Sequence, residues 1–203
     1  VFAQPLEAPM RGLRVGWLGD LEGYLPFEPG ILSLCEHGLK ALADVGCEVQ
    51  ATSLGFAPQR LWEMWLTLRS CVVAGGRWDD YADPARRAQM KPEAVWEVER
   101  GQAASALDVY RASKERTAWH RHLLTLFARF DILVLPTAQV FPFDADLHWP
   151  KTVAGRTMDT YHRWMEVVIG PTLAGAPAIS VPVGFGAAGA PMGMQLIGAP
   201  GAD

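Results

Sequence analysis

The first third of the chain alternates between strand and helix patterns, and this alternation constrains the fold more than any other feature. Residues 13–18 are a short apolar run that ends in a glycine-rich turn, so they predict a buried strand. Pro29 opens a segment with apolar residues at helical spacing as far as Gly46, and residues 47–54 alternate as a strand does. Two strands joined through one helix pair in parallel with a right-handed crossover. The pattern over 13–54 therefore predicts an α/β fold, with a mixed sheet flanked by helices.

A helical insertion is expected over residues 58–130. Its first helix runs over 58–74 and is expected to end at Gly75 and Gly76, because adjacent glycines disfavour a helix. Two short helices follow, each with a proline at its start, where the missing N–H costs nothing. A long, charged helix is then predicted over 103–130. Such an insertion is too long for a simple doubly wound domain.

The remaining third contains the most apolar strand of the chain. Residues 131–135 include four consecutive apolar side chains before a proline, which is typical of a fully buried strand. A loop rich in proline and aromatic residues is expected over 139–157. A helix at 158–169 and a strand ending at 185 complete the segment 158–185. Pro182 cannot donate to a ladder, so it places this last strand at a sheet edge or a bulge.

Size and charge limit the classes of function. The chain has 203 residues, half of them hydrophobic, and a net charge of −4. This length fits one domain with a core of its own. The arginines are scattered and no basic block occurs, so neither nucleic acid nor an anionic membrane surface is expected as a partner.

The cysteines and the apolar runs indicate a cytoplasmic protein. Three cysteines, an odd number without a CxxC pair, favour reduced thiols over a disulfide framework or a zinc site. No run approaches about 18 apolar residues, so no membrane span is expected. The opening residues 1–12 lack the basic start and apolar core of a signal peptide.

A search for catalytic motifs finds none. The chain has no GxSxG elbow, no HExxH pair and no phosphate-binding glycine loop. Its serines are isolated; Ser180 is the most tempting nucleophile, but it has no neighbouring base and is interpreted as part of the scaffold. The pairs Asp79–Asp80 and Asp144–Asp146 lack a partner base or a metal set. No catalytic residue, metal ligand or cofactor site is therefore assigned within the chain.

One polar pattern stands out on the predicted long helix. Residues with small or polar side chains recur three or four positions apart, which would line one side of that helix: Gly101, Ser105, Asp108, Ala112 and Arg116. Polar groups on a buried helix side need partners. Such a side is interpreted as a structural network that locks the helix to its neighbour, with the wall of a pocket as the alternative.

Five motifs occur in an order that resembles the C-terminal half of amidase signature family enzymes. They are LRVGWLGDLEG, EPGILSLCEHGLKALADVGCEV, the polar pattern just described, FDILVLPTA, and GPTLAGAPAISVPVGF followed by APMGMQLIG. Each motif alone is weak, but together they extend over nearly all of residues 1–203. The resemblance implies a partial amidase domain with the C-terminal part of that family's fold.

The resemblance also implies an activity and an incomplete active site. Family members hydrolyse a carboxamide with a serine nucleophile, a second serine bridging through a cis peptide, and a lysine that accepts the proton. This chain has no Ser–Ser pair and no matching lysine. We therefore expect a fragment that supplies scaffold and part of the pocket to a parent amidohydrolase, and that is inactive alone. The alternative is a non-catalytic binding or interaction module derived from an amidase.

The partners and the pocket follow from the same resemblance. A small-molecule amide is the expected substrate of the parent protein, and a surface that faces the missing core is expected to allow homo-oligomers. Ligand crevices in α/β sheets lie beyond the carboxyl ends of strands, and the candidate pocket residues are Thr137, Ala138, Trp164, Ile169 and Thr172. Core packing is the alternative role for each of them. Family members commonly have asparagine where this chain has Thr172, so the chemistry at that position differs.

Overall fold

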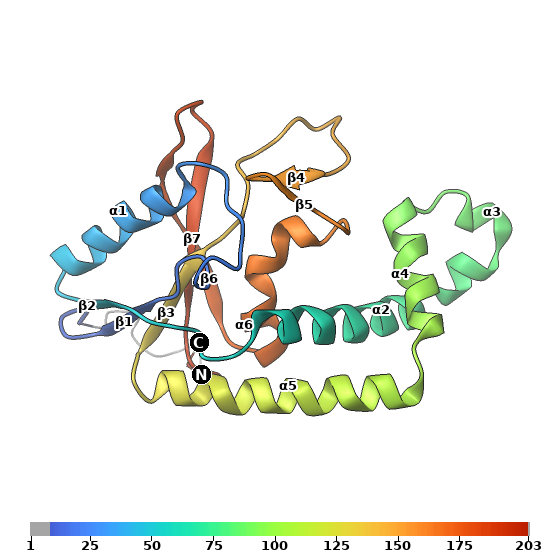
Figure 1. Ribbon diagram of the computed structural model, residues 1–203, viewed down its shortest axis with the longest axis horizontal. Coiled ribbons are helices and arrows are strands. Elements are labelled where there is room, and N and C mark those ends of the chain that lie inside the picture. The colour runs from blue at the N-terminus through green and yellow to red at the C-terminus, as the bar shows by residue number, and fades with distance from the viewer. Residues whose placement is uncertain (1–8, 203) are drawn as a thin grey trace.

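The computed structural model describes residues 9–202, and a mixed five-stranded sheet in the order β2-β1-β3-β7-β6 lies at its centre (Figure 1). The central strand β3 pairs in parallel with β1 and antiparallel with β7, which also pairs antiparallel with β6. The α/β fold class with a mixed sheet is thereby confirmed. Residues 1–8, which carry most of the expectation about a signal peptide, lie outside the described range. The strands are β1 (Arg14–Trp17), β2 (Glu48–Ala51), β3 (Ile132–Pro136), β6 (Ala178–Phe185) and β7 (Pro191–Ile197).

Helices cover both faces of this sheet. The helix α1 packs on one face through Cys35 and Leu39, while α2, α5 and α6 pack on the other face around Leu133 and Leu135. The far end of α2 projects away from the sheet and carries α3 and α4 with it (Figure 1). The helices are α1 (Ile31–Asp44), α2 (Pro58–Ala82), α3 (Pro84–Arg87), α4 (Pro92–Ala103), α5 (Ala106–Phe127) and α6 (Ile169–Ala174).

The first helix of the insertion does not end at its glycine pair. Helix α2 continues through Gly75 and Gly76 to Ala82, so the expected break there was wrong. A glycine inside a helix costs only about 1 kcal/mol relative to alanine. Packing of α4 along α2 is sufficient to offset a cost of this size. Tertiary contact thus overrides the local propensity.

The long helix expected over 103–130 is in fact two elements. Helix α4 ends at Ala103 and α5 begins at Ala106, with Ser105 as its N-cap. The Ser105 hydroxyl accepts the backbone N–H of Asp108, and the Asp108 carboxylate accepts the N–H of Ser105. This capping box is exposed and marks a helix start. The polar pattern therefore does not line one buried side of a single helix, and the prediction of one continuous ladder was wrong.

The helix expected over 158–169 begins later than predicted. Residues 158–162 are not helical, and the chain then enters a 3-10 helix, η1 (Arg163–Val168), which leads directly into α6. The preceding loop contains a short hairpin of β4 (Thr152–Val153) and β5 (Arg156–Thr157). Its second strand uses residues close to those of the predicted helix start, which displaces the helix toward the C-terminus.

Strand β6 lies at the edge of the sheet, as its proline indicated. A register shift interrupts its pairing with β7 between Pro182 and Gly184, which is a bulge at the position of the missing N–H. Two of its large apolar side chains are exposed, Ile179 by 61% and Phe185 by 70%. The apolar character of this strand is therefore not explained by the core that the described residues form.

The long helices of the insertion are amphipathic rather than uniformly apolar. Within residues 9–202, no helix combines the length and the apolar character that crossing a bilayer requires.

Candidate functional site

Two hydroxyl groups meet where β3 ends. The backbone N–H of Thr137 continues the ladder by donating to Gly193 of β7 at 3.0 Å. This pairing presents the Thr137 side chain beside Ser180 of the edge strand, and their Oγ atoms lie 2.8 Å apart. Gly193 keeps the pair uncovered, because a Cβ at that position would lie 2.6 Å from Ser180 Oγ. Topology thus places three distant segments at one polar point.

The hydroxyl pair lies in an open groove of about 520 Å³. Its walls are mostly apolar, and the loop after β3 supplies two phenylalanines, Phe141 and Phe143. Phe143 meets the Trp164 ring edge-on, with ring centroids 5.3 Å apart. A few polar groups within an apolar concavity are typical of small-molecule sites. The lining residues are Thr137, Ala138, Val140, Phe141, Pro142, Phe143, Trp164, Ser180, Pro182, Pro191, Met192 and Gly193.

The structure brings three of the five candidate residues together. Thr137, Ala138 and Trp164 line this groove. Ile169 is only 3% exposed and lies against the core between the sheet and the helices. Thr172 is exposed elsewhere, and its hydroxyl donates to the carbonyl of Val168 at 3.0 Å, within the same turn of helix.

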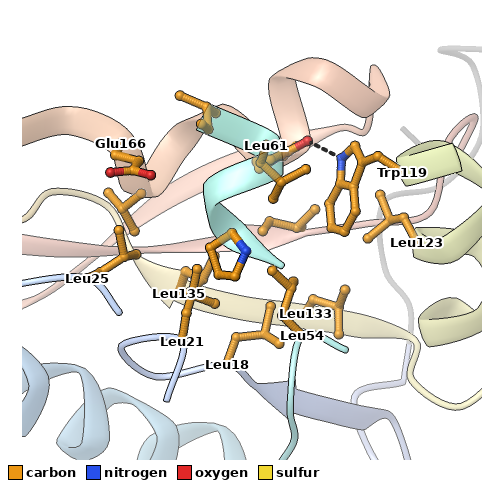
Figure 2. A pocket seen from close by; sticks show the side chains of 16 residues that line it. Leu18, Leu21, Leu25, Leu54, Leu61, Trp119, Leu123, Leu133, Leu135 and Glu166 are labelled. Carbon is orange, nitrogen blue, oxygen red and sulfur yellow. Dashed lines mark hydrogen bonds between the residues drawn. The ribbon is translucent and has the colours of Figure 1, made fainter. Parts of the chain in front are cut away.

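Ile169 faces a small internal cavity instead. This cavity has a volume of about 30 Å³ and is walled by leucines from several elements, with Glu166 and Trp119 at opposite sides of the view (Figure 2). Such a volume holds about one or two waters rather than an organic ligand. The cavity is thus a packing defect of the core.

Glu166 is a buried carboxylate with a complete set of partners. Tyr24 donates to it at 2.8 Å and Arg163 at 3.0 Å, and Arg163 also pairs with Asp159. Burial raises the pKa of Glu166, and the hydrogen bonds from Tyr24 and Arg163 partly oppose that rise. The guanidinium lies 4.0 Å above the Trp62 ring. These contacts anchor η1 to the first turn region and to α2.

Two buried glutamines, which no catalytic motif includes, fix the floor of the groove. Gln139 Oε1 accepts the backbone N–H of Val167 at 3.1 Å, and Gln195 Nε2 donates to the carbonyl of Val167 at 3.2 Å. Gln195 also donates to Pro136, the last residue of β3. Both side chains are at most 4% exposed. A polar residue inside an apolar run, as in AQV and MQL, was the available signal.

Helix α5 holds α6 through side chains on one of its faces. Arg116 Nε donates to the carbonyl of Leu173 at 2.7 Å, and Trp119 Nε1 donates to Gly170 at 2.8 Å. The carbonyl of Leu173 lies in the last turn of α6, where no intrahelical donor remains. Arg116 of the polar pattern therefore has a structural contact, although its side chain is not buried.

Neither hydroxyl of the groove has a basic partner within the described residues. The hydrogen bond between them involves no histidine, lysine or carboxylate, which nucleophilic catalysis by serine requires. Burial raises the pKa of the Cys35 thiol to about 12, so that thiol stays protonated. No group of three potential metal ligands occurs among residues 9–202.

Comparison with known proteins settles the family. The family model described as Amidase matches residues 1–203, the whole of the chain. The chain belongs to the amidase family. A glutamyl-tRNA(Gln) amidotransferase subunit from Synechococcus sp. strain CC9605 is 33% identical over 220 residues, covering 98% of this amidase chain and 43% of the relative.

Two further likenesses agree on fold and on extent. An acylamidase from Rhodococcus erythropolis is 24% identical over 199 residues, with 96% of this chain and 40% of the relative covered. The crystal structure of a bacterial aryl acylamidase of the amidase signature family superposes with a TM-score of 0.81 at 20% identity, covering 94% of this chain and 40% of that one. The amidase chain thus spans about two fifths of the length of these relatives.

Proposed function

We propose that this chain forms one wall of the substrate pocket in a longer amidase that hydrolyses a carboxamide. The groove beside the Thr137–Ser180 hydroxyl pair carries this proposal, because it lies beyond the carboxyl end of β3 and has the size of a ligand site. The apolar walls would hold the acyl or amine substituent of a small-molecule amide. The hydroxyls would donate to, or accept from, the amide itself.

The catalytic groups belong to a part of the protein outside these residues. The family resemblance supplies a serine nucleophile, a bridging serine and a lysine, and none of them matches a position in this chain. Membership of the amidase family and the extent of the match, about two fifths of the relatives, support this division. We therefore expect the chain alone to be inactive and the complete gene product to act in the cytoplasm.

The open edge of β6 is the proposed place where the two parts meet. Ile179 and Phe185 expose apolar surface along an eight-residue strand whose outer backbone groups have no neighbouring strand in the sheet of residues 9–202. Additional chain of the longer protein would cover this edge. A second copy of the chain would cover it when that part is missing, which is the basis of the expected homo-oligomer.

The test compares amide hydrolysis by the chain and by the complete gene product. The chain is expected to show no turnover above background, and the complete product is expected to show turnover. Gly193→Ala should raise KM by about tenfold, since its Cβ would displace the Ser180 hydroxyl by steric overlap. Gly76→Ala is the control, because a Cβ there meets nothing within 4 Å.

Two results would contradict the proposal. Turnover by the purified chain would require a nucleophile within residues 1–203. Binding of amides by the complete product without any turnover would favour the alternative, a binding module derived from an amidase.

A further inference from the structure

A second cavity lies on the helical side of the molecule, between the first turn of α4 and the loop that carries the β4–β5 hairpin. Its volume is about 330 Å³, within the range of roughly 300 to 1,000 Å³ that small-molecule sites occupy. Three aromatic side chains, Trp96, Trp149 and Tyr161, form much of its wall, together with Glu93 of α4. It shares no residue with the groove at the end of β3.

Two oxygen atoms of this cavity's lining residues are buried without a hydrogen-bond partner among the described residues. They are Oε2 of Glu93 and Oγ1 of Thr160. The other carboxylate oxygen of Glu93 lies 2.5 Å from Nε2 of His148. Buried polar atoms in native proteins are nearly always partnered, and an unpaired carboxylate oxygen is especially unfavourable. An N–H donor entering the cavity would supply the missing partner.

The aromatic wall already holds one cation of the chain itself. Lys151 Nζ lies 3.3 Å from the centroid of the Trp149 ring, in the geometry of a cation–π contact. The faces of aromatic rings carry negative electrostatic potential, so they favour ammonium groups over anions or neutral polar groups. Glu93 adds a formal negative charge to the same cavity, whereas the nearby Asp159 is already paired with Arg163.

We propose that this cavity binds a small organic ammonium ion. Its nitrogen donates to Glu93 Oε2 and Thr160 Oγ1 after a small adjustment of those side chains, and its organic part packs against Trp96, Trp149 and Tyr161. An anion would meet the Glu93 carboxylate, and a neutral ligand would gain little from the aromatic faces. The proposal concerns binding alone and does not depend on amide hydrolysis.

Lys151 gives the proposal a directional consequence. Its ammonium occupies one aromatic face and repels a second cation in the same cavity. Removing that charge should therefore increase the affinity for an amine, whereas removing the Glu93 charge should reduce it. A variant that binds more tightly cannot owe that gain to loss of folding.

The test is isothermal titration of the chain with 2-phenylethylamine, and with 2-phenylethanol as the neutral isostere. The amine should bind with an affinity at least about tenfold above that of the alcohol. Glu93→Gln should weaken amine binding by about tenfold, and Lys151→Met should strengthen it about threefold or more. Lys91→Met, an exposed lysine outside the cavity, is the control for loss of a positive charge.

Thermal unfolding of each variant verifies that it folds. Absence of amine binding, equal affinity for the amine and the alcohol, or unchanged affinity in Glu93→Gln would each overturn the proposal. An equal gain in Lys91→Met and Lys151→Met would also overturn it, because the effect would then reflect overall charge.

Discussion

His162 is a histidine that the fold holds in a neutral state. It is 2% exposed and packs against Trp65 and Trp96, with Nε2 lying 3.3 Å from Oε1 of Glu97. Burial lowers the pKa of His162 to about 4, and the positive charge of Arg69 contributes to this shift. The imidazole therefore serves as an aromatic packing group with one polar contact rather than as a cation.

This shift makes the stability of the chain depend on pH in a defined window. The unfolded chain binds a proton at this position below about pH 6.5, whereas the folded chain does so only near pH 4. The stabilisation is complete above pH 6.5 and is lost as the pH falls toward 4, with a decrease in unfolding free energy of about 2 to 3 kcal/mol. Urea unfolding at several pH values across this window measures it.

Two variants separate His162 from the other titrating groups. His162→Phe keeps an aromatic ring in the cage and removes the titration, so its unfolding free energy should vary less between pH 6.5 and 4. His37→Gln, on the exposed side of α1, should keep the profile of the original chain. An unchanged profile in His162→Phe would assign the pH dependence to other groups.

At the scale of elements, the closest helix contact lies where α4 crosses α2. A Cβ added to Gly101 would lie 2.3 Å from the backbone carbonyl oxygen of Ser70 and 2.6 Å from the Ala74 side chain. Backbone cannot yield as a flexible side chain does, so only glycine fits this crossing. The contact fixes α4 against α2 and thereby the helical side of the cavity that contains Glu93.

Two alanine substitutions of glycines in this helix pair should have opposite effects. Gly101→Ala should lower the unfolding free energy by about 1 to 3 kcal/mol, the usual cost of overpacking. Gly75→Ala in α2 meets no atom within 4 Å and should raise it by about 0.5 to 1 kcal/mol, because alanine favours the helix. Urea unfolding of both variants measures the difference. Stability equal to that of the original chain in Gly101→Ala would show that the helices separate freely.

The sequence predicts those elements whose signals are local. The apolar run of β3 and the helix opened by Pro29 are visible in periodicity and composition, and the mixed sheet follows from them. The continuation of α2 through Gly75 is not visible, because it depends on packing against α4. Ser105 fits the spacing of a helix side, although the same serine with Asp108 is a helix-start signal.

The groove was predictable in part for the same reason. Thr137 and Ala138 follow from the rule that sites lie beyond strand ends, and both line the groove. Gln139 and Gln195 depend on a contact with Val167 of η1, which no local pattern indicates. Ser180 and Gly193 join the site only through strand pairing, so their proximity required the sheet order to be known.

At the scale of the whole molecule, the two sheet edges differ in length and character. Strand β2 is a four-residue edge with mostly exposed short or charged side chains. Strand β6 has eight residues and exposes Ile179 and Phe185, with only the Pro182 bulge to discourage pairing. Long apolar edges favour addition of another strand. The β6 edge is therefore the surface through which the chain should associate.

We expect the purified chain to self-associate through β6 when nothing else covers that edge. Sedimentation velocity at rising concentration should show larger species, and Ile179→Lys should shift them toward the monomer, because an edge lysine opposes strand addition. Val72→Lys is the matched control, since Val72 is 74% exposed on α2, away from the sheet. A compact monomer at all concentrations, or dissociation by both variants alike, would show that this edge is not an association surface.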